Sequence, residues 1–94
     1  MKGSDIEKRV ASFARELGFM SVGLKGLPIY SSSCASLFIS ASGRTAILIF
    51  KSESESEFPD SFLTDFIRNL GKHHQVVHVI SSVRSGRQAI QGLQ

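Results

Sequence analysis

The sequence predicts a single α/β domain over residues 1–94, with a mixed sheet flanked by helices in the order helix, strand, strand, strand, helix, strand, helix. Three observations predict this class. Helical and strand periodicities alternate along the chain, a glycine-containing turn joins two apolar runs, and a helical segment separates the last strand from its neighbour. The length of 94 residues, 41% of them hydrophobic, suits one small core.

The first helix is expected between Ser4 and Gly18. Ser4 and Glu7 match a capping box, and Gly18 suits a left-handed residue after the helix end. Residues 19–24 are mostly apolar and contain a glycine, which predicts a short bent strand. The apolar residues of the helix recur at the spacing of one face: Ile6, Val10, Phe13, Ala14 and Leu17.

A hairpin of two strands is expected next. Residues 35–40 and 45–50 predict strands joined at residues 41–44, where Gly43 allows a tight turn. The second strand is apolar throughout, which is typical of a central strand buried on both faces. The polar residues 30–34 before the hairpin indicate a loop. The first three strands are therefore expected to form an antiparallel meander.

A βαβ unit is expected in the second half of the chain. Residues 52–57 alternate serine with glutamate, which indicates a solvated loop. A helix is expected over residues 59–71, and residues 76–80 predict another buried strand. This strand should lie parallel to residues 45–50 through a right-handed crossover.

The last helix is expected from a second capping pattern, Ser85 with Gln88. The net charge of the whole chain is only +3, but its basic residues are unevenly placed. Residues 66–94, which include this helix, contain no acidic residue and form a basic block. Such a block favours a polyanion as partner, and the alternative is that its cations only solvate two helices. The block holds Arg68, Lys72, Arg84, Arg87 and all three histidines, His73, His74 and His78.

The sequence predicts no metal site and no cofactor. Cys34 is the single cysteine, so it can form neither an internal disulfide nor a thiolate zinc site, and a small buried residue is expected. His73 and His74 are adjacent and cannot share one helical face. With no apolar run of about 20 residues, no membrane span is expected, and a cytoplasmic protein is the prediction.

The element order, with Lys51 closing the central strand, resembles the PD-(D/E)XK nuclease fold and its restriction-endonuclease-like core. Within that superfamily the chain is most similar to the VRR-NUC and archaeal Holliday-junction-resolvase-like domains. The residues that carry the resemblance are Glu7 on the first helix, Gly43 and Arg44 at the turn, Lys51, Leu70 and Gly71 at a helix end, and the strand from Val76 to Val83 followed by Arg84.

The metal ligands of that superfamily are missing from this chain. An aspartate on the second core strand and a glutamate two residues before the lysine would bind the metal, and Ala35 and Ile49 occupy those positions. Because Mg²⁺ prefers carboxylate oxygens, the resemblance implies a nuclease-like domain without its metal site. Lys51 and Glu7 would then be remnants of the catalytic set.

We therefore expect a catalytically inactive domain that binds branched or duplex DNA by its shape. Most aromatic residues fall at core-facing positions, and Tyr30 alone is expected to stack on a base. A homodimer is also expected for so small a sheet protein. The residues expected to contact phosphates are Lys25, Arg44, Lys51, Arg84 and Arg87.

Two alternatives stay open. The first is an active Mg²⁺-dependent endonuclease whose displaced carboxylates would come from Glu53, Glu55 or Asp60. The second is a phage or mobile-element factor that uses the fold to bind another protein.

Overall fold

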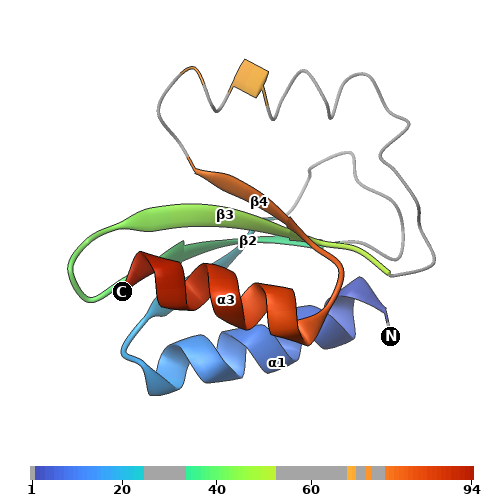
Figure 1. The fold of residues 1–94 in the computed structure, drawn as a ribbon, viewed down its shortest axis with the longest axis horizontal. Helices are drawn as coiled ribbons and strands as arrows, with labels where there is room; N and C mark the ends of the chain where they lie inside the picture. The colour runs from blue at the N-terminus through green and yellow to red at the C-terminus, as the bar shows by residue number, and fades with distance from the viewer. Residues whose placement is uncertain (1, 25–33, 53–67, 70–71, 73–75) are drawn as a thin grey trace.

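The computed structural model describes residues 2–24, 34–52, 68–69, 72 and 76–94. Four strands form one mixed sheet, and two helices lie side by side against one of its faces (Figure 1). The elements are α1 (Gly3–Glu16), β1 (Met20–Leu24), β2 (Cys34–Ile39), β3 (Thr45–Phe50), β4 (Val77–Ile80) and α3 (Val83–Leu93).

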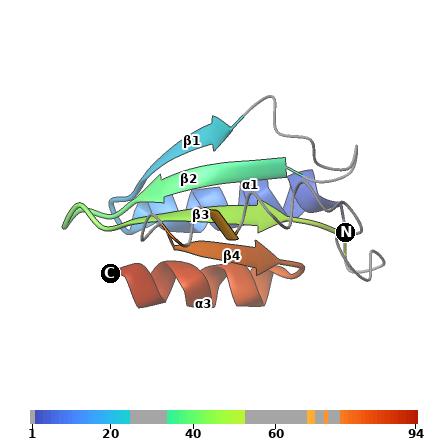
Figure 2. The ribbon, with the colours of Figure 1, turned by 90° about the horizontal axis from the view of Figure 1, so that it is seen from above.

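The strands follow their order in the sequence, β1-β2-β3-β4, across the sheet (Figure 2). The pairs β1–β2 and β2–β3 are antiparallel and the pair β3–β4 is parallel, which confirms the predicted meander and the predicted parallel pair. The hairpin turn is confirmed as well, with Gly43 at φ +88°. The prediction that the loop extends to residue 34 is wrong, because Cys34 already belongs to β2 and pairs with Phe50 of β3. Residues 30–33, the acidic loop from residue 53, most of the predicted helix over 59–71 and the hand of the crossover lie outside the described residues.

The core lies between the sheet and the two helices. Ile6, Val10 and Ala14 of α1 are fully buried, as the helical spacing predicted. They pack with side chains of β2 and β3 in one cluster. Within it the Phe38 ring meets the Phe50 ring edge to face, with 6.3 Å between centroids.

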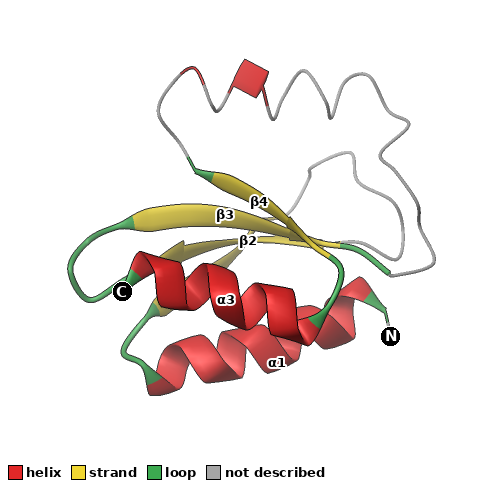
Figure 3. Cartoon of the chain, viewed as in Figure 1, coloured by secondary structure: helices red, strands yellow, loops and turns green. Residues whose placement is uncertain are grey.

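The two helices approach each other closely at Gly86 of α3. A Cβ atom at Gly86 would overlap the Val10 side chain and lie 3.2 Å from Ile80 Cγ2, so only glycine fits between α1 and β4. Both helices run in the same direction, and both begin at the end of the sheet where β3 and β4 finish (Figure 3).

The helix starts differ from the predicted capping patterns. Helix α1 begins at Gly3 with Lys2 as N-cap and no capping side chain, so the predicted Ser4 cap is wrong. The N-cap of α3 is Ser82, whose extended backbone allows its Oγ to accept the Ser85 N–H at 3.1 Å. The predicted Ser85 cap is therefore one turn too late. The end of α1 is as predicted, with Gly18 at φ +87°.

The burial of the strands depends on their place in the sheet. Strand β3 has a neighbour on each side and is buried over most of its length, as predicted. Strand β4 is an edge strand, and Val76 and Val79 are 45% and 43% exposed beside an exposed His78. The prediction that β4 is buried is therefore wrong. No helix in the described part of the chain is long and apolar enough to cross a membrane.

Candidate nucleic-acid interface

Glu7 joins α1 to the start of β2. Its Oε2 accepts the Cys34 thiol at 2.9 Å, and its Oε1 accepts the Ser36 hydroxyl at 3.1 Å. Ser36 is only 2% exposed, so the carboxylate provides the partner that a buried hydroxyl needs. The predicted capping role of Glu7 is wrong, because the residue acts between elements rather than at the helix end.

Burial and the Glu7 contact together keep the Cys34 thiol protonated. Burial raises the pKa of the Cys34 thiol to about 12, and the hydrogen bond to Glu7 and the charge of that carboxylate add to the effect. The side chain is half-buried, so the prediction of a buried residue is wrong, and it stays protonated at neutral pH. Cys34 is therefore a hydrogen-bond donor rather than a nucleophile.

We expect Cys34 to react slowly with iodoacetamide in the folded protein. Below pH 9 the thiolate population is about a thousandfold smaller than for a thiol at the ordinary pKa of 9.0. Glu7→Gln should speed the reaction only in part, because burial is the larger cause. The folded protein favours the protonated Cys34 thiol. The contribution of this thiol to the free energy of unfolding is therefore complete below pH 9 and is lost as the pH rises towards 12. Mass spectrometry of timed samples measures the rate, and a folded protein that reacts as fast as the chain in denaturant would contradict this account.

The positions expected for metal ligands are neighbours in the sheet but hold apolar residues. The register pairs Ala35 with Ile49, and these side chains are 2% and 0% exposed. Alternation along β3 directs Lys51 to the face of Ile49. Glu7 contacts β2 from α1, on the opposite face. The structure therefore does not bring Glu7 and Lys51 together, and the described residues contain no group of three His, Cys, Asp or Glu that could hold a metal ion.

The predicted phosphate contacts occupy two ends of the sheet. The Lys51 N–H donates to the Ile80 carbonyl at 2.9 Å, so Lys51 lies at the end of the sheet where α3 begins. Arg84 lies in the first turn of α3. Arg44 is exposed in the hairpin before β3, and a strand of six residues separates it from Lys51 by about 20 Å. Lys25 lies outside the described residues.

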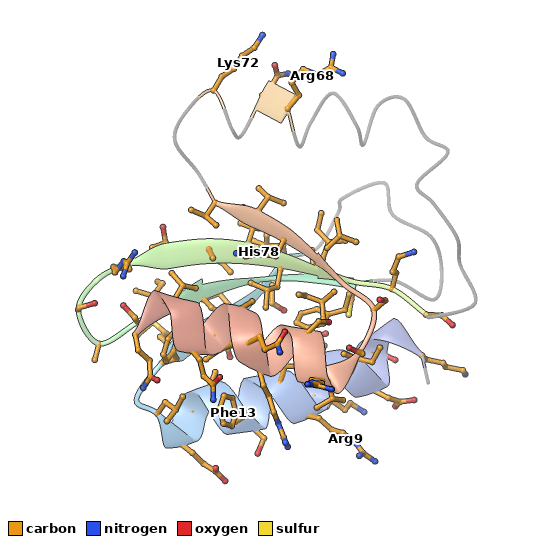
Figure 4. The ribbon with its side chains drawn as sticks, viewed as in Figure 1. Arg9, Phe13, Arg68, Lys72 and His78 are labelled. Carbon is orange, nitrogen blue, oxygen red and sulfur yellow. The ribbon has the colours of Figure 1, made fainter. Side chains whose placement is uncertain are left out.

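Arg9 of α1 and Arg87 of α3 line one groove between the two helices. Arg9 was not among the residues predicted to contact phosphates. The groove has a volume of about 310 Å³, and Arg9 and Phe13 lie along α1 (Figure 4). The guanidinium carbon of Arg87 is 5.4 Å from the centroid of the Phe13 ring, a cation–π contact. The groove is lined by Arg9, Ser12, Phe13, Glu16 and Arg87.

The exposed charge of the helical layer is mostly positive. Neither Arg9 nor Arg87 forms an ion pair with any residue that the structure describes. Only two carboxylates of the layer, Asp5 and Glu16, are exposed. The exposed basic residues on or next to the two helices are Lys2, Lys8, Arg9, Arg15, Arg84 and Arg87.

No known protein family, curated protein or solved structure matches this chain. Its function must therefore be inferred from its own residues. The exposed arginines of α1 and α3, with the groove between these helices, are the candidate site.

Proposed function

We propose that the protein binds nucleic acid through phosphate contacts from its helical layer and does not cut it. One observation carries the proposal: Arg9 and Arg87 line one groove from two helices, and neither forms an ion pair with a described carboxylate, although Glu16 lines the same groove. Arg84 extends this surface towards the start of α3, and the first turn of α3 has no acidic residue.

Arginine suits this role because its planar guanidinium presents several N–H donors to phosphate oxygens. Exposed arginines without acidic partners keep these donors available to a ligand. Contacts of this kind position a protein on the backbone and carry no base information. We therefore expect recognition of shape, with branched or duplex DNA as the partner.

The absence of cleavage is supported by the positions that the nuclease resemblance assigns to metal ligands. Ala35 and Ile49 are apolar and almost fully buried, so they offer no oxygen to Mg²⁺. Glu7 already accepts one hydrogen bond on each carboxylate oxygen. A catalytic site would need other carboxylates at Lys51, as the endonuclease alternative assumes.

Fluorescence anisotropy with labelled duplex, forked and four-way DNA tests this proposal. Affinity should fall with salt, with a slope in log K of about −0.9 for each phosphate neutralised. The double variant Arg84→Gln/Arg87→Gln should reduce that slope by about 2. The matched variant Arg44→Gln removes one charge at the other end of β3 and should change the slope less.

Two outcomes would overturn the proposal. Failure to bind any of the three DNA forms at low salt would remove nucleic acid as the partner. Cleavage of DNA in Mg²⁺ or Mn²⁺ that disappears in Lys51→Ala would favour the endonuclease alternative.

A further inference from the structure

We propose that the groove between α1 and α3 holds one unpaired nucleotide of a nucleic-acid strand. The base would stack on the Arg87 guanidinium, which itself lies over the Phe13 ring, and the phosphate would bind Arg9. This inference rests on the proposed function and adds the substrate class: strands with unpaired nucleotides, such as forks and overhangs, in preference to continuous duplex.

Phe13 and Arg87 form a stacked pair on the wall of the groove. Phe13 is half-buried at the margin of the core, and the Arg87 guanidinium lies 5.4 Å from its ring centroid. Aromatic rings and guanidinium planes are the two side-chain groups on which unpaired bases stack. The cation–π contact holds Arg87 beside the ring, so less ordering is needed when a base arrives.

The polar residues that line the groove suit a nucleotide. Arg9 supplies donors for a phosphate, and the Ser12 hydroxyl can donate or accept. Glu16 lines the same groove and is acidic, which disfavours a run of bare phosphates. A nucleotide suits both signs, because its phosphate pairs with Arg9 while a base amino group donates to the Glu16 carboxylate.

The position of the groove restricts which bases can enter it. The groove lies between two helices, with Gly86 bringing α3 against α1. In a duplex the bases are stacked inside the helix, so a base can enter such a groove only when it is unpaired or displaced. The duplex backbone can still contact Arg84 and Arg87 from outside. Selectivity for unpaired strands follows from this difference.

Anisotropy titrations with a fluorescein-labelled single strand and with the corresponding duplex test the inference. Arg87→Lys keeps the charge and removes the planar group, and Phe13→Leu keeps the apolar bulk and removes the ring. Each should weaken single-strand binding about tenfold, within the range measured for base stacking, and change duplex binding less than about twofold. Lys8→Gln, which removes an exposed charge outside the groove, should weaken both ligands equally.

The outcomes separate this inference from the proposed function. If both ligands bind and Arg87→Lys leaves single-strand affinity unchanged, the groove inference is wrong and phosphate binding stands. If neither ligand binds at low salt, both are wrong. Arg87 is exposed on α3, so Arg87→Lys decides the question even if Phe13→Leu proves unstable.

Discussion

Gly86→Leu should destabilise the domain by about 3 kcal/mol or more. Any Cβ at this position overlaps the Val10 side chain, and Val10 is fully buried and cannot move into solvent. The same Cβ would lie 3.2 Å from Ile80 Cγ2, and Ile80 is only 3% exposed. The larger side chain must therefore separate α3 from α1 and β4, which opens the core and the groove together.

Urea denaturation followed by circular dichroism measures this effect. Gly86→Ala should lower stability by about 1–3 kcal/mol, and Gly86→Leu by more. Gly92→Ala is the matched control on the same helix, because a Cβ at Gly92 meets nothing within 4 Å. That variant should be neutral or stabilising by up to about 1 kcal/mol. A Gly86→Ala midpoint at or above that of the unmodified protein would show that the two helices are not in close contact.

Phe38→Ala should cost about 3–5 kcal/mol. Phe38 is fully buried in β2, and its ring packs edge to face on Phe50. Domains are commonly stable by only about 5–15 kcal/mol, so this loss removes a large share of the total. We expect a strongly lowered midpoint or an unfolded chain.

Thermal unfolding of Phe38→Ala alongside Met20→Ala checks the result. Met20 is apolar but 63% exposed in β1, so its truncation should change stability by less than about 0.5 kcal/mol. A loss below about 1 kcal/mol for Phe38→Ala would mean that the ring is not central to the core.

Much of the described fold could be predicted from local patterns. The apolar residues of α1 repeat at helical spacing, and an uninterrupted apolar run marks β3 as central. The turn between β2 and β3 contains the glycine that its positive φ requires. Each of these signals lies within a few residues of the structure that it specifies.

Features that depend on distant partners could not be predicted in this way. Glu7 stands three residues after Ser4, which imitates a capping box, but its real partners lie 27 and 29 residues away. The exposure of β4 depends on its place at the sheet edge, which strand periodicity does not encode. For Glu7 and for β4, contacts between distant parts of the chain therefore decide the structure, and local sequence patterns do not show them.

The residues of the candidate site also differ in how far the sequence alone could indicate them. Arg84 and Arg87 were predicted from the acid-free block, whereas Arg9 was missed because residues 1–65 are nearly neutral overall. A local signal did exist: Arg9 and Phe13 are four residues apart and therefore share a face of α1. Its meaning depends on Gly86, which brings α3 alongside that face.

The common direction of α1 and α3 gives the molecule an electrical polarity. Each helix contributes a partial charge of about +0.5 at its first turn, and both first turns lie where β3 and β4 end (Figure 1). Asp5 offsets this charge in α1, but no acidic residue does so in α3. Because the two helices are parallel, their dipoles add at this end of the described structure instead of cancelling as they would in an antiparallel pair. Under the proposed function, a phosphate near the start of α3 would meet Arg84 and the positive end of a helix dipole together.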